Sequence, residues 1–237
     1  MVPHFLWGVA QGGLLFRCLS KPQRERQIQK WARTMLKRLG VDLKIVGAPA
    51  PTGPMLLVAN HISWVDILAL HAVCPCRFVA KADVERWPLL GTIVTGGGTL
   101  YVKRESRRDA MRVVYRMAQA LKDGDILAVF PEGTTSDGSS VLPFHSSLLQ
   151  AAISADAPVQ PVALQIVNGR SGRPSQAASY MGDESLAGSV WRTLYARELR
   201  AVVTFGVPQR AAGRDRRAWA KDLHNEVAAM RLREPPR

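Results

Sequence analysis

Short, continuous apolar runs constrain the fold of this 237-residue chain more than any other feature. Residues 54–60, PMLLVAN, and residues 126–130, ILAVF, contain no charged side chain. Such runs are typical of strands that are buried on both faces of a sheet. Similar patterns predict further strands over residues 41–47, 77–81, 99–104, 159–167 and 200–208.

Segments with helical spacing of apolar residues separate these strands. They predict helices over residues 22–39, 63–72, 106–122 and 214–233. Because strands alternate with helices, we expect an α/β domain with a largely parallel central sheet flanked by helices. In sheets of this kind the ligand site lies outside the carboxyl ends of the strands.

The charge balance indicates an anionic partner. The net charge is +13, from 32 basic and 19 acidic residues. A solvated surface explains part of this excess, but an anionic membrane surface or a nucleic acid explains it better. Aromatic residues make up only 7% and do not interleave regularly with basic ones, so we expect no nucleic acid. The three cysteines, Cys18, Cys74 and Cys76, lack the spacing of a zinc site, and we expect no metal.

Residues 2–16 carry no formal charge and are followed by a basic segment. They are too short to span a bilayer comfortably, and no signal-peptide cleavage site clearly follows. An apolar segment followed by basic residues suits a monotopic membrane anchor, and an N-terminal core helix is the alternative. We therefore divide the chain into a membrane-associating helical segment, residues 1–40, and a main domain, residues 41–237, which carries the motifs described below.

Polar residues follow three of the predicted strands directly. His61 follows residues 54–60 and can act as a general base near neutral pH. Asp66 can reach it only if His61 stands before the helix and Asp66 lies in its first turns. The chain contains no G-x-S-x-G motif, so the group that such a histidine activates would belong to the substrate. On these residues alone a structural His–Asp pair is the simpler interpretation, because the spacing is weakly specific.

The two other clusters are FPEGTTSDG, residues 130–138, and GGGTLYVKR, residues 96–104. Backbone N–H groups in the first can bind an anion, and Glu132 suits a hydroxyl acceptor or a brace for an arginine. In the second, three glycines permit close approach to the backbone ahead of Arg104. A surface turn and a flexible loop are the respective alternatives.

Taken in order, these motifs resemble the glycerolipid acyltransferase family, specifically its 1-acylglycerol-3-phosphate acyltransferase branch. The residues that carry the resemblance are Asn60-His61 with Asp66, Gly98 with Arg104, Phe130 to Thr134, and Val159 to Ala163. The resemblance covers roughly residues 25–210. Each motif is weak, whereas the ordered set is specific, and it favours a catalytic His61–Asp66 pair.

The resemblance implies a mechanism without a metal or a cofactor. His61, oriented by Asp66, would deprotonate a lysolipid hydroxyl, which would attack the thioester of acyl-CoA or acyl carrier protein. We expect the substrate to be bound by Asn60, Lys81, Gly98, Arg104, Glu132, Gly133 and Thr134. The expected location is the cytoplasmic face of a bacterial inner membrane, on an anionic surface.

Thr135 departs from the family pattern, which commonly reads E-G-T-R-S at this motif. The missing arginine would pair with a phosphate, although Arg104 and Lys81 can compensate. Bacterial lyso-ornithine lipid acyltransferases resemble the E-G-T-T variant, and their acceptor carries no phosphate. We therefore keep three hypotheses in order: transfer to 1-acylglycerol-3-phosphate, transfer to lyso-ornithine lipid, and a non-catalytic basic protein that binds membranes or nucleic acid.

Overall fold

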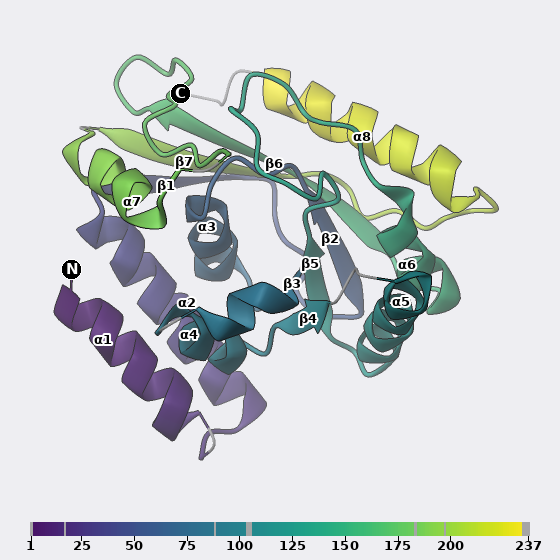
Figure 1. The fold of residues 1–237 in the computed structure, drawn as a ribbon. Coiled ribbons are helices and arrows are strands. Elements are labelled where there is room, and N and C mark those ends of the chain that lie inside the picture. The colour runs from purple at the N-terminus through teal and green to yellow at the C-terminus, as the bar shows by residue number, and fades with distance from the viewer. Residues whose placement is uncertain are drawn as a thin grey trace.

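A computed structural model of the chain describes residues 2–16, 18–87, 89–102, 106–182, 184–196 and 198–233 (Figure 1). Within these residues, seven strands form one sheet in the order β1-β7-β6-β2-β5-β3-β4. Their bounds are β1 Val41–Val46, β2 Met55–Ala59, β3 Arg77–Lys81, β4 Leu100–Val102, β5 Ile126–Val129, β6 Val159–Asn168 and β7 Leu199–Phe205. Neighbouring strands run parallel except β6 and β7, so the predicted largely parallel sheet is confirmed.

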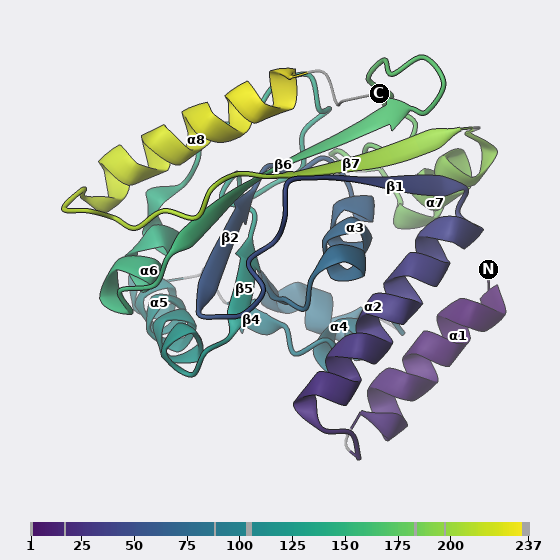
Figure 2. The same cartoon turned by 180° about the vertical axis from the view of Figure 1, so that it is seen from behind.

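Helices cover both faces of the sheet (Figures 1 and 2). One face carries α2 (Lys21–Arg38), α3 (Val65–Val73) and α7 (Leu186–Tyr195), and the other carries α5 (Arg107–Lys122), α6 (Leu149–Ser154) and α8 (Arg216–Leu232). Side chains of β2 alternate between the two cores: Leu57 packs with α2 and α3, whereas Leu56 and Val58 pack with α5. Apolar side chains on both faces explain why β2 is a continuous apolar run in the sequence.

The four helices predicted from spacing are present as α2, α3, α5 and α8. Each begins and ends no more than two residues from its predicted bounds. Three shorter or less regular helices were not predicted, namely α4 (Leu90–Gly96), α6 and α7. Short helical turns also occur at η2 (Ala82–Arg86) and η3 (Ser146–Leu148).

The first residues form α1 (Val2–Ala10) and a π-helical turn, η1 (Gln11–Leu15), which pack against α2 and α4. The Trp31 indole N–H donates to the His4 carbonyl oxygen at 3.1 Å, and the His4 ring contacts the Trp31 carbonyl oxygen at 3.1 Å. Leu6 and Trp7 remain exposed on α1. Within the part of the chain that the structure describes, no helix combines the length and the apolar character that crossing a bilayer requires.

Candidate active site

The chain leaves the sheet at Asn60, at the carboxyl end of β2. The neighbouring strand β6 continues past this point, and the Asn60 side chain takes the place of the next strand residue. Its Oδ1 accepts from the Leu164 N–H at 2.7 Å, and its Nδ2 donates to the Leu164 carbonyl oxygen at 3.0 Å. The amide is buried with both of its polar atoms bonded, so it fixes the point at which the loop to His61 begins.

His61 and Asp66 meet just outside this strand end. The His61 Nδ1 atom lies 2.9 Å from Asp66 Oδ2. Helix α3 begins at Val65, so Asp66 lies in its first turn while His61 stands before it, which is the arrangement that the spacing requires. The same carboxylate oxygen accepts the main-chain N–H groups of Ile62 at 2.6 Å and Ser63 at 2.8 Å. Asp66 therefore fixes both the imidazole and the loop that carries it.

Glu132 holds the main chain of His61 from the other side. Its Oε1 accepts the His61 N–H at 2.7 Å, and its Oε2 accepts the Leu142 N–H at 3.0 Å. The Ser136 N–H donates to the His61 carbonyl oxygen at 2.9 Å. Burial raises the pKa of Glu132, and the two N–H donors offset this shift only in part. The loop after β5 thus binds the peptide groups on both sides of the His61 α-carbon.

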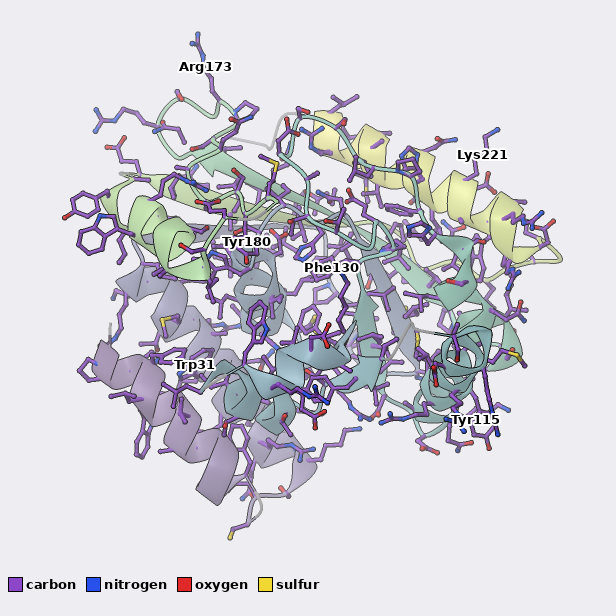
Figure 3. The ribbon with its side chains drawn as sticks, viewed as in Figure 1. Trp31, Tyr115, Phe130, Arg173, Tyr180 and Lys221 are labelled. Carbon is purple, nitrogen blue, oxygen red and sulfur yellow. The ribbon has the colours of Figure 1, made fainter. Side chains whose placement is uncertain are left out.

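The Phe130 ring stacks on the His61 imidazole, with centroids 3.8 Å apart and planes 6° apart. Figure 3 labels Phe130 in the middle of the face that it shows. The His61 side chain is 17% exposed, and among the described residues its Nε2 has no hydrogen-bond partner. A carboxylate on Nδ1 favours the tautomer that leaves Nε2 free to take a proton. The arrangement suits a general base that faces a bound substrate.

The other predicted site residues lie in different places. Gly133 and Thr134 continue the loop after Glu132; Gly133 has a left-handed φ of +72°, and Thr134 is exposed. Lys81 ends β3 at the same edge of the sheet and is exposed. Gly98 precedes β4 at the opposite edge, where its carbonyl oxygen accepts from Arg77 Nε at 2.7 Å. Arg104 lies outside the described residues, and the substrate-binding roles of this group stay predictions.

A second loop closes on the His61 loop and was not predicted. The Tyr180 N–H donates to the Ile62 carbonyl oxygen at 3.1 Å, and the Thr135 hydroxyl donates to the Tyr180 carbonyl oxygen. The Trp64 indole N–H donates to Ser189 Oγ of α7 at 3.1 Å. These partners are far apart in the sequence, so no local pattern could reveal them. Phe130 was named as part of the third motif, but its stacking on His61 was not predicted.

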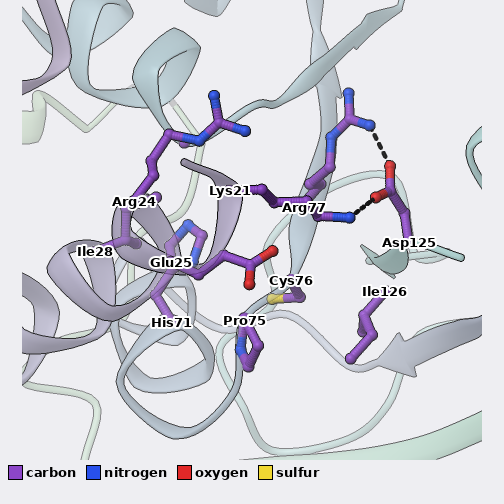
Figure 4. A pocket seen from close by; sticks show the side chains of 11 residues that line it. Lys21, Arg24, Glu25, Ile28, His71, Pro75, Cys76, Arg77, Asp125 and Ile126 are labelled. Carbon is purple, nitrogen blue, oxygen red and sulfur yellow. Dashed lines mark hydrogen bonds and ion pairs between the residues drawn. The ribbon is translucent and has the colours of Figure 1, made fainter. Parts of the chain in front are cut away.

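A polar pocket at the amino edge of the sheet is separate from this site (Figure 4). In it the Asp125 carboxylate, just before β5, accepts hydrogen bonds from Lys21 of α2 and Arg77 of β3. Through Asp125, these two bonds join α2 to β3 and to the start of β5. Because ligand sites of parallel sheets lie at the carboxyl edge, we assign this cluster to the attachment of α2.

Comparison with known proteins identifies the family of the chain. Residues 42–165 match the Acyltransferase family. The chain is 36% identical over 206 residues to the lyso-ornithine lipid O-acyltransferase of Pseudomonas aeruginosa, covering 87% of this chain and 78% of that protein. It is 36% identical over 213 residues to the 1-acyl-sn-glycerol-3-phosphate acyltransferase of Neisseria meningitidis, covering 87% and 81%.

The fold is also similar to the crystal structure of the 1-acyl-sn-glycerophosphate acyltransferase PlsC from Thermotoga maritima. The TM-score is 0.69 at 19% identity, over 98% of this chain and 95% of the other. The chain belongs to the acyltransferase family. It is an enzyme of acyl transfer, which confirms the resemblance that the motifs indicated and sets aside the hypothesis of a non-catalytic binding protein.

Proposed function

We propose that this enzyme transfers a fatty acyl chain from a thioester to the free hydroxyl of a lysolipid, with 1-acylglycerol-3-phosphate as the acceptor and phosphatidic acid as the product. The observation that carries the proposal is the His61–Asp66 pair at the carboxyl edge of the sheet. The name of the Neisseria relative supports this choice of acceptor.

In this mechanism His61 Nε2 takes the proton of the acceptor hydroxyl while the oxygen attacks the thioester carbonyl carbon. The tetrahedral intermediate then collapses, the C–S bond breaks, and the imidazolium returns the proton to the leaving sulfur. Asp66 stabilises the imidazolium that forms between these steps. General base catalysis of this kind contributes about 10²–10⁴-fold to a rate. Acyl-CoA and acyl carrier protein are the two candidate donors.

The acceptor lies in a bilayer, so the enzyme would work at a membrane, and we propose the cytoplasmic face of a bacterial inner membrane. The exposed Leu6 and Trp7 of α1 and the net charge of +13 support attachment to an anionic surface. The division at residue 40 belongs to the same proposal. Helix α2 lies within residues 1–40 yet contributes Ala32, Met35 and Leu36 to the core, so we assign the membrane contact to α1.

Lyso-ornithine lipid is the second candidate acceptor, and Thr135 is the observation that favours it. The Thr135 hydroxyl is bonded to the Tyr180 carbonyl oxygen at the position where the family commonly has an arginine that can bind phosphate. The name of the Pseudomonas relative supports this alternative.

A donor–acceptor matrix with purified protein in detergent tests both candidates. It offers acyl-CoA and acyl carrier protein against lysophosphatidic acid and lyso-ornithine lipid. We expect transfer to lysophosphatidic acid, and a strong preference for the ornithine acceptor would refute the first choice. The His61→Ala variant should lose at least about 100-fold in turnover with its thermal unfolding intact, whereas retained transfer would contradict the proposed base.

A further inference from the structure

Helix α7 exposes an aromatic face that has no partner within the described chain. Trp191 and Tyr195, one turn apart, are 63% and 67% exposed, and their ring centroids lie 4.8 Å apart. Met181, in the loop before the helix, is also exposed. The opposite face of α7 is buried through Ser189 and Thr193. A cluster of large exposed apolar side chains is typical of a surface that contacts a protein, a membrane or a ligand.

The helix and its preceding loop are fixed before any partner arrives. The Arg192 guanidinium donates to the carbonyl oxygens of Ala177 and Ser179 and forms an ion pair with Glu184. These bonds hold Ala177, Ser179 and Glu184 against α7. Because the surface is ordered in advance, little conformational entropy would be lost on docking.

The chemistry of this face suits the interfacial region of a bilayer. Trp and Tyr combine an apolar ring with a polar group and concentrate where acyl chains meet headgroups. Figures 1 and 2 both show α7 on the same side of the molecule as α1, whose Leu6 and Trp7 are exposed. The net charge of +13 complements an anionic lipid surface.

The inner face of α7 is joined to the loop that carries His61. Ser189 accepts the Trp64 indole N–H, and Tyr180 of the preceding loop donates to Ile62. A bilayer contact on the outer face of α7 would therefore set the orientation of the His61 loop relative to the lipid surface.

We propose that α7 is a second membrane-docking element, whose Trp191 and Tyr195 enter the headgroup region of an anionic bilayer beside α1. The inference rests on the proposed function, in which the acceptor hydroxyl belongs to a lipid in that bilayer. Together the two elements would fix the face of the enzyme that meets the membrane, which one helix alone would leave free to rotate.

The test is co-sedimentation of full-length protein with vesicles of phosphatidylcholine and phosphatidylglycerol. The double variant Trp191→Ala/Tyr195→Ala should bind about tenfold more weakly or worse, since it loses two apolar rings from the interface. The matched control is Met111→Ala/Tyr115→Ala on α5, where the side chains are 69% and 71% exposed. Tyr115 lies on the side of the molecule away from α1 and α7 (Figure 3), so the control should bind like the wild type.

The double variant Trp191→Phe/Tyr195→Phe should retain most of the vesicle binding, because both positions keep an aromatic ring. The thermal unfolding temperature of the alanine pair should stay unchanged, because both side chains are exposed. Its transfer rate should fall on acceptor presented in vesicles but not on a short-chain, water-soluble lysolipid. If the alanine pair still binds vesicles but transfers slowly both to acceptor in vesicles and to the water-soluble lysolipid, the docking role is overturned.

Unaltered vesicle binding by the alanine pair would also overturn it. So would a change in oligomeric state with vesicle binding retained, since the face would then be an interface between protein chains. If the wild type transfers to no lysolipid while vesicle binding still depends on Trp191 and Tyr195, the docking element stands and the proposed function fails.

Discussion

His61 is positioned by contacts from separate segments of the chain rather than by its own loop. Asp66 holds its ring, Glu132 and Ser136 hold its peptide groups, and Phe130 covers one face of the imidazole. The neutral bond from Ser136 contributes about 1 kcal/mol to stability, and each bond to a carboxylate contributes about 1.5–3 kcal/mol. Their larger effect is geometric, because a base displaced by an ångström can lose about 100-fold in rate.

Glu132 is expected to act on turnover rather than on substrate affinity. Glutamine has one acceptor oxygen, so in Glu132→Gln either the His61 N–H or the Leu142 N–H would face an amide NH₂ group. We expect kcat to fall about 10–100-fold with little change in KM. Steady-state kinetics measure kcat and KM for Glu132→Gln, with Ser140→Ala, at an exposed position, as the matched control. A raised KM at unchanged kcat would instead support the substrate-binding role that the resemblance implies.

His71 makes stability depend on pH. Burial lowers its pKa from 6.5 to about 4. Between these values the unfolded chain binds more protons than the folded one, so the free energy of unfolding falls as pH drops from 6.5 toward 4. The loss from this one group is about 3 kcal/mol at most. Urea unfolding across this range should show a flatter pH dependence for His71→Asn, and an equally steep one would contradict the prediction.

At the scale of elements, glycines let the N-terminal segment pack against α4. A Cβ on Gly12 would lie 2.9 Å from the Thr92 carbonyl oxygen, and one on Gly96 would lie 2.8 Å from the Gly12 Cα. A Cβ on Gly13 would meet only the Thr92 methyl carbon, at 3.6 Å. Contacts below 3 Å with backbone atoms force the two elements apart, so η1 tolerates no side chain at residue 12.

This pair of adjacent glycines gives a matched test. Gly12→Ala should lower the free energy of unfolding by about 1–3 kcal/mol through overpacking. Gly13→Ala should be neutral or stabilise by up to about 1 kcal/mol, because alanine restricts the unfolded chain. Thermal unfolding of both variants measures the difference. Equal destabilisation would show that the contact of η1 with α4 is not tight.

The predictable elements were those whose pattern is long and regular. The helices α2, α5 and α8 each have 16 residues or more and were predicted. Helices α4 and α6 have 7 and 6 residues, too few for a periodic pattern to stand out. Helix α7 was missed because it is also short, at 10 residues, and because its buried side carries Ser189 and Thr193 while Trp191 and Tyr195 are exposed, the reverse of the usual pattern.

At the scale of the whole molecule, the two edges of the sheet have different tasks. The carboxyl edge gathers His61 with the residues that hold it, whereas the amino edge joins α2 to the sheet through Asp125. Burial raises the pKa of Asp125, but the hydrogen bonds from Lys21 and Arg77 outweigh it and leave the pKa below its usual range. This contribution to stability is present at neutral pH and is lost as acid protonates the carboxylate.

Asp125 lies at the amino edge of the sheet and His61 at the carboxyl edge. We therefore expect Asp125→Ala to lower stability without changing turnover. Lys21 and Arg77 would lose their common acceptor, and we expect a loss of about 1 kcal/mol, since both side chains are partly exposed. The kcat should stay within about twofold of wild type, because additivity holds for distant sites. Urea unfolding and a turnover assay on the same preparation test this, and a large fall in kcat without unfolding would refute the separation.

The sequence by itself determined the parts of this enzyme that depend on near neighbours. Apolar runs and helical spacing reveal strands and helices because burial repeats every two or 3.6 residues, and they placed His61 and Glu132 at strand ends. Only the tertiary structure decided how those ends meet. The bonds of Asn60 to Leu164 and of Glu132 to His61 join residues 104 and 71 positions apart, and the sheet order that brings them together follows from packing over the whole chain. The same packing decides that Gly98, just before β4, lies at the amino edge beside Arg77 of β3, across the sheet from His61.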